Sequence, residues 1–77
     1  MQIRILVFGQ LTDVTNSSEL TLDNIKDTDS LVAELNSRYP AFSHAKYVVA
    51  VDKLTIASNT ILKDGSTIAL LPPFSGG

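Results

Sequence analysis

Apolar and polar residues alternate in the first third of the chain, and this pattern predicts two strands. The first strand, residues 2–8, has Ile3, Ile5 and Val7 on one face and Arg4, Leu6 and Phe8 on the other. Because only Arg4 interrupts the apolar character of the second face, we expect both faces to be partly covered, or one to meet a partner. Residues 11–18 are polar, with room for one helical turn at most. Residues 19–25 alternate again and should pair with the first strand as a hairpin.

A single helix is predicted between residues 28 and 39. Thr28 can cap its N-terminus, and leucines at positions 31 and 35 continue an apolar stripe that ends at Tyr39. Pro40 disfavours a helical backbone at Tyr39, so we expect the helix to end there. A stripe of this width can cover one face of a sheet.

Three later segments are predicted to be strands. Residues 46–51, KYVVAV, are β-branched and nearly all apolar, which is typical of a central buried strand. After a loop at residues 41–45, that strand leads to a possible short strand at residues 54–57. Asp64-Gly65 marks a turn, and residues 67–71 form a last strand closed by two prolines, which cannot donate ladder hydrogen bonds.

This order of elements predicts an α+β fold in which one main helix crosses a mixed sheet of four or five strands. If the first and last strands are parallel neighbours at the centre, the fold is a β-grasp, the ubiquitin-like roll. We expect one domain at residues 1–71, followed by an extended tail at residues 72–77.

Composition excludes most catalytic arrangements. The 77 residues are 44% hydrophobic and 18% charged, near the lower size limit for a domain with its own core. There is no cysteine, and the single histidine, His44, lies in a polar loop, which excludes a Cys–His pair and a histidine-rich metal site. Neither a glycine-rich phosphate loop nor a nucleophile-elbow motif is present. We expect no metal, no cofactor bound by the chain itself, and no complete enzyme.

Charge and hydropathy limit the possible partners. The net charge is −2 and the six basic residues are scattered, so nucleic acid is not an expected partner. No basic leader with a long apolar core opens the chain, and no apolar run reaches the roughly 20 residues of a membrane span. We expect a cytoplasmic protein without a membrane partner.

The chain ends in LLPPFSGG, so any chemistry of its last two residues lies in the backbone and the terminal carboxylate. Pro72 and Pro73 favour an extended backbone, and the six residues from Pro72 onward reach roughly 20 Å when extended. Gly76 and Gly77 can pass through a channel that excludes larger residues. Such a terminus suits a substrate that another enzyme activates covalently. The alternative is a frayed, cut or cloned end.

Two segments resemble the family of small, sulfur-carrier subunits of molybdopterin synthase. Residues 5–13, ILVFGQLTD, are similar to that family's Phe-small-x-Leu-x-acidic pattern, and residues 62–77, LKDGSTIALLPPFSGG, are similar to its Pro-Pro-x-Ser/Thr-Gly-Gly ending. The length and the place of the helix agree with the family. Asp52 and the Ser66-Thr67 pair depart from the family's usual turn residues, which bears on partner contacts more than on the tail.

The resemblance implies a function for the tail. Gly77 would be adenylated by an activating enzyme of the ubiquitin-E1 type, using ATP and magnesium, and sulfur would then replace AMP to leave a thiocarboxylate. The tail would enter the large, catalytic subunit of a heterotetramer of two small and two large subunits, and would supply the dithiolene sulfur of molybdopterin. Gly76, without a side chain, would allow the tail to enter the partner's channel. Pro72 and Pro73 would direct the tail away from the domain, and Ser75 would serve as a small spacer.

Docking also requires a surface. If the sheet face away from the helix is free, Leu6, Phe8 and Leu71 can form an apolar patch near the tail, with Phe74 at its edge. Leu6 and Leu71 can equally be core residues. For Phe8 we favour a place in the partner interface, because it lies on the strand face opposite Ile3, Ile5 and Val7.

Other functions fit the same tail. The chain could carry sulfur for thiamine, cysteine or tRNA thiolation, or it could be a ubiquitin-like modifier joined to lysines of other proteins. It could also be a plain interaction domain in which the tail is incidental.

Overall fold

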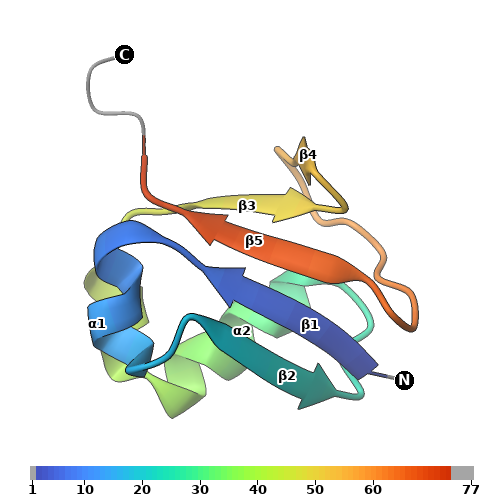
Figure 1. The fold of residues 1–77 in the computed structure, drawn as a ribbon. Helices are drawn as coiled ribbons and strands as arrows, with labels where there is room; N and C mark the ends of the chain where they lie inside the picture. Colours follow the sequence, from blue (N-terminus) through green and yellow to red (C-terminus); the bar gives the residue numbers. More distant parts are fainter. Residues whose placement is uncertain (1, 74–77) are drawn as a thin grey trace.

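Five strands form one mixed sheet, and helix α2 (Thr28–Arg38) packs across one of its faces in the computed structural model, which describes residues 2–73 (Figure 1). The strands are β1 (Gln2–Val7), β2 (Glu19–Asp23), β3 (Val48–Val51), β4 (Leu54–Thr55) and β5 (Thr67–Leu71). Their order across the sheet is β2-β1-β5-β3-β4. Three short helical segments complete the description: η1 (Gly9–Leu11), α1 (Thr12–Thr15) and η2 (Pro40–His44).

The first and last strands are parallel neighbours at the centre of the sheet, as the prediction required. β1 pairs with β5 in parallel, with Ile5 opposite Ile68, and with β2 in the predicted antiparallel hairpin, with Ile5 opposite Leu20. β5 also pairs antiparallel with β3. The predicted fold is therefore confirmed, including the upper number of strands.

The core lies between the sheet and α2. Its sheet side follows from the period of two along β1, since Ile3, Ile5 and Val7 are at most 2% exposed. Its helix side follows from the spacing of four between Leu31 and Leu35, both fully buried. Further buried side chains come from β5 and η2: Ile68, Leu70 and Phe42.

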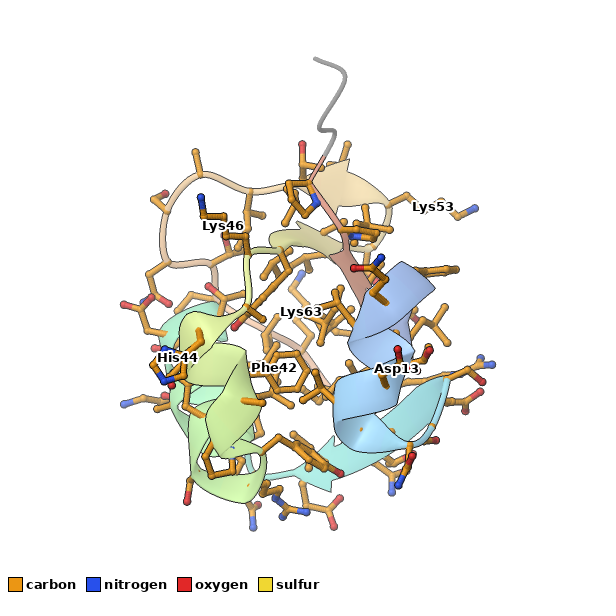
Figure 2. All side chains as sticks on the ribbon, turned by 90° about the vertical axis from the view of Figure 1, so that its left-hand side faces the viewer. Asp13, Phe42, His44, Lys46, Lys53 and Lys63 are labelled. Atoms are coloured by element: carbon orange, nitrogen blue, oxygen red, sulfur yellow. The ribbon has the colours of Figure 1, made fainter. Side chains whose placement is uncertain are left out.

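Phe42 closes one end of this core. Its ring packs edge-on against Tyr39 and Tyr47, with ring centroids 5.9 and 5.4 Å apart. Figure 2 shows Phe42 enclosed between the helical segments at this end of the domain. The loop predicted at residues 41–45 is thus the 3-10 helix η2, whose Phe42 makes it part of the core rather than a polar connection.

The helix begins one residue earlier than predicted. Asp27, and not Thr28, is the N-cap: its backbone is extended and its side chain accepts a hydrogen bond from Ser30 N at 2.9 Å. Thr28 is the first helical residue, and its hydroxyl accepts a hydrogen bond from Thr60 N at 2.9 Å. The predicted C-terminal end is confirmed, since α2 ends at Arg38 and Tyr39 is its C-cap.

Three strand predictions need correction. The strand expected at residues 46–51 is shorter, starts at Val48, and lies fourth in the sheet, because β5 takes the central place between β1 and β3. Val48 and Val49 are accordingly only half-buried. β2 ends at Asp23, two residues before the predicted end. β4 is limited to Leu54–Thr55, two residues shorter than the strand expected at residues 54–57. Residues 11–18 contain one helical turn, α1, as expected, and η1 precedes it.

The capping carboxylate makes stability depend on pH. Hydrogen bonds from the side chain and the backbone of Ser30, with a smaller effect from Asn59, hold the pKa of Asp27 below its ordinary value of 3.8. Because the folded-state pKa is lowered, the stabilisation is present above the unfolded pKa. It is lost as the pH falls through the folded-state value.

We expect Asp27→Asn to keep most of the cap while removing this titration, and Asp27→Ala to lose the cap at every pH. Urea unfolding at a series of pH values measures both effects. The stability advantage of the wild type over Asp27→Asn should shrink below about pH 4. An advantage that stays constant from neutral to strongly acidic pH would contradict the assignment of Asp27 as the titrating cap.

Candidate functional site

The sheet face opposite α2 is not covered by any helix of the described chain and carries an apolar depression, here called the outer hollow (Figure 1). Its volume is about 460 Å³. The residues that line it are Leu6, Phe8, Ala50, Asp52, Lys53, Thr55, Thr67, Ala69 and Leu71. All three residues predicted for the partner interface are among them.

Small side chains form the floor of the outer hollow. The strand register places Leu6 beside Ala69 and Ala69 beside Ala50, so that two alanines sit next to each other in the middle of the sheet. Alanine side chains end at Cβ, whereas Leu6, Phe8 and Leu71 extend further from the sheet. The depression follows from this difference in side-chain length.

The predicted interface residues differ in exposure. Phe8 is 44% exposed, whereas Leu6 and Leu71 are half-buried. Leu6 and Leu71 do not belong to the cluster of side chains packed between the sheet and α2. They lie on the other face of the sheet, so they are not ordinary core residues.

The root of the tail, Pro72 and Pro73, follows directly from the rim of this hollow. Leu70 O accepts a hydrogen bond from Phe8 N at 3.1 Å, so the chain just beyond β1 lies beside the end of β5. Gly9 then has a positive φ of +62°, and a Cβ on it would approach Cγ of Pro72 to 2.7 Å. The absent side chain of Gly9 therefore leaves the space in which Pro72 lies.

A second depression, of about 240 Å³, lies on the other side of the tail root. Pro72 and Pro73 line it together with residues of η1, α1 and the segment after η2: Gln10, Leu11, Val14, Ala45 and Lys46. The exposed tail root thus lies next to Gly9 on one side and borders this second depression. The remaining predicted tail residues, Phe74, Ser75, Gly76 and Gly77, lie outside the described residues.

The described residues, 2–73, provide no set of side chains suited to hold a metal ion. Within that range no three His, Cys, Asp or Glu side chains come together as metal ligands would. His44 ends η2, is exposed, and points away from the body of the domain (Figure 2). No described helix has the length and apolarity that a membrane crossing requires.

The prediction from sequence missed three parts of this site. Ala50 and Ala69 were not recognised as its floor, although small residues at alternate positions of two apolar strands are a usable signal. Gly9 follows the predicted first strand, and the sequence does not indicate its contact with Pro72. Asp52 was noted only as a departure from the family's turn residues, and the place of Asp52 and Lys53 at the outer hollow could not be inferred without the register.

The parallel central pair, the helix on one face and the tail leaving from the central strand define a ubiquitin-like domain of the β-grasp class. The model of the ThiS family matches residues 5–77, and the chain belongs to this family.

Named relatives agree with this membership. The chain is 30% identical over 82 residues to the molybdopterin synthase sulfur carrier subunit of Mycobacterium tuberculosis, covering 100% of this chain and 99% of that protein. It is 26% identical, with a TM-score of 0.75 and full coverage of both chains, to a chain in a complex of subunits 1 and 2 of the molybdopterin-converting factor from Helicobacter pylori. Small archaeal modifier protein 1 of Methanosarcina acetivorans is 25% identical, with a TM-score of 0.80, and covers 99% of this chain and 96% of its own.

The contact between Gly9 and the tail root can be tested against a matched glycine. Gly65 also has a positive φ, +84°, but a Cβ on it would meet nothing within 4 Å. Both Gly9→Ala and Gly65→Ala introduce backbone strain, and only the first adds a collision. We expect Gly9→Ala to lower the free energy of unfolding by about 1–3 kcal/mol more than Gly65→Ala.

Pro72→Ala removes the Cγ atom that the new methyl group would meet, so it should recover part of the extra loss in the Gly9→Ala background. Denaturant unfolding of the four proteins gives the coupling between the two positions. Equal costs at Gly9 and Gly65, or strict additivity with Pro72→Ala, would show that the contact does not hold the tail root.

Proposed function

We propose that this protein is the sulfur carrier subunit of a molybdopterin synthase and that the carboxylate of Gly77 is the group that carries sulfur. The observation that carries this proposal is the full-length similarity to a sulfur carrier subunit in M. tuberculosis. The position of the tail root at the rim of an uncovered apolar hollow supports it, because a carrier must present its terminus and its docking surface together.

The chemistry of the tail follows from the weakness of a carboxylate as an acyl donor. Adenylation would join the Gly77 carboxylate to AMP and release pyrophosphate from ATP, with magnesium, on an activating enzyme of the E1 type. A sulfur nucleophile would then attack the acyl carbon, AMP would leave, and a thiocarboxylate would remain. In the synthase this group would give its sulfur to the pyranopterin precursor, two carriers supplying the two sulfurs of each dithiolene.

The chain itself would supply geometry and not catalytic side chains. The sheet ends at Leu71, and Pro72 and Pro73 have no N–H to extend its ladder. We propose that residues 72–77 form an extended tail, separate from the domain at residues 1–71, which reaches roughly 20 Å into the large subunit. The catalytic groups would then belong to that subunit.

The outer hollow is the proposed docking site for the large subunit. It is lined mainly by apolar side chains and adjoins the tail root, as a surface that guides a tail into a channel should. The relative from H. pylori was solved with subunit 2 of its converting factor, which supports a partner of this kind. The expected assembly has two small and two large subunits, and we propose that it works in the cytoplasm.

Mass spectrometry tests the proposal directly. Incubation of the purified protein with its activating enzyme, ATP, magnesium and a sulfur donor should raise the intact mass by about 16 Da, the difference between sulfur and oxygen. An unchanged mass, under conditions in which a known carrier reacts, would refute a carrier role. Higher-mass adducts on lysines of other proteins that resist thiols would favour the modifier reading instead.

Removal of Gly76 and Gly77 should abolish sulfur loading and leave the unfolding midpoint unchanged, because the last strand ends at Leu71 and the described core extends no further than Leu70. Addition of one alanine after Gly77 should be nearly as damaging, since it converts the acyl group into a peptide bond. Thiocarboxylate formation and thermal unfolding measure the two properties separately. Loading of either variant at the wild-type rate would show that Gly77 is not the reactive position.

Filling the outer hollow should prevent docking. Ala69→Leu places a larger side chain on its floor, and we expect affinity for the large subunit to fall at least about tenfold with little change in the fold. Thr21→Leu is the matched control, since it adds the same side chain to the exposed edge strand β2 outside the hollow. Calorimetric titration with the large subunit measures both. Equal affinities for Ala69→Leu and Thr21→Leu would place the docking surface elsewhere.

A further inference from the structure

The turn between β3 and β4 holds a residue in an unfavourable backbone conformation. Val51 pairs with Leu54, so the turn consists of Asp52 and Lys53 alone. Both have positive φ, 48° and 76°, as in the type I′ turn, where Asn-Gly is the preferred sequence. A side chain with a full aliphatic stem is costly at the position where glycine is preferred.

The other non-glycine residues with positive φ in the described chain have an evident structural reason for this conformation, and Lys53 does not. Asn16 and Asn24 are of the type that tolerates this region. Asp52 is held by Thr67, whose N–H donates to its carboxylate at 3.0 Å while Asp52 N donates to Thr67 O at 2.8 Å. Within residues 2–73, the Lys53 side chain takes part in none of the hydrogen bonds or ion pairs found. A strained residue without a structural reason is a candidate for a function.

The place of Lys53 indicates what that function is. Lys53 lines the outer hollow and is the single cation among the lining residues. Figure 2 shows its side chain extending away from the body of the domain. The carboxylate of the neighbouring Asp52 accepts a hydrogen bond from Thr67 N in the sheet, and it forms no ion pair with the Lys53 ammonium group.

The basic residue of β1 on this face, Arg4, already has a partner. Arg4 donates through Nε and Nη2 to the two carboxylate oxygens of Glu19, at 3.0 and 3.2 Å. This pair lies on the β1–β2 side of the sheet, and neither residue lines the outer hollow. The hollow therefore offers an incoming surface an apolar floor and, at its rim, the Lys53 ammonium group, which has no side-chain partner among residues 2–73, next to the carboxylate of Asp52.

We propose that Lys53 is a specificity-determining residue of the outer hollow and pairs with a carboxylate on the large subunit, next to an apolar side chain that fills the hollow. This inference rests on the proposed function, since it names the chemistry of the same docking partner. In this inference the strained turn serves to place the Lys53 ammonium group at the rim of the hollow.

Substitution by glycine separates the backbone strain at Lys53 from the contribution of its positive charge to binding. Glycine relieves the strain, so Lys53→Gly should raise the thermal unfolding midpoint by a few degrees. A midpoint that stays the same or falls would overturn the premise that the turn is strained. Lys53→Met keeps the stem and removes only the charge, and it should leave the midpoint close to that of the wild type.

Although Lys53→Gly should stabilise the fold, it should weaken binding to the purified large subunit. We expect Lys53→Gly and Lys53→Met to weaken binding about threefold to tenfold, and Lys53→Glu to weaken it further. Wild-type affinity should fall as salt is raised from about 50 to 500 mM, and this dependence should be smaller for Lys53→Met. Lys63→Met, which removes a charge outside the hollow, is the control and should bind like the wild type.

The outcomes separate this inference from the proposed function. If the wild type binds the large subunit and Lys53→Met binds equally well with the same salt dependence, the role of the charge is refuted and the docking proposal stands. If the wild type does not bind the large subunit at all, the proposed docking partner is refuted, and the inference about Lys53 is refuted with it.

Discussion

The parallel pairing of β1 with β5 at the centre of the sheet determines most of this molecule. Parallel neighbours cannot be joined by a tight turn, so the chain between them has to cross over, and the crossing carries α2 over one face. The other face stays uncovered, which is why an apolar hollow can exist there. Because the two strands run in the same direction, the end of β5 also lies beside Gly9, and the tail leaves the domain at the rim of that hollow.

Much of this arrangement was predictable from sequence because it depends on local patterns. Alternation identified β1 and β2, and the Asp64-Gly65 turn and the two prolines bounded β5. The spacing of Leu31 and Leu35 with Pro40 placed α2 to within a residue. Residues 46–51 could not be placed, because an apolar run does not reveal whether a strand is central or next to the edge. For the candidate site, Leu6, Phe8 and Leu71 came from the alternation, whereas the floor formed by Ala50 and Ala69 depends on strand register. The strain at Lys53 depends on a turn conformation that composition does not encode.

The features of the candidate site are mainly spatial: a floor of small residues, a glycine that makes room for Pro72, and a charge at the rim. Within the described chain no three His, Cys, Asp or Glu side chains come together as metal ligands would. Stability and the proposed docking are in conflict at two points, since the apolar face lacks a cover and Lys53 takes an unfavourable conformation. Both features are understandable in a protein whose working surface is completed by another subunit.

The most direct test of this account is sulfur transfer by the loaded protein. The chain, converted beforehand to its Gly77 thiocarboxylate, is mixed with the large synthase subunit and the pyranopterin precursor, without ATP or the activating enzyme. The account predicts formation of the molybdopterin dithiolene, with about two carriers returned to the carboxylate form for each product. A loaded protein that binds the large subunit but transfers no sulfur to the precursor would contradict it.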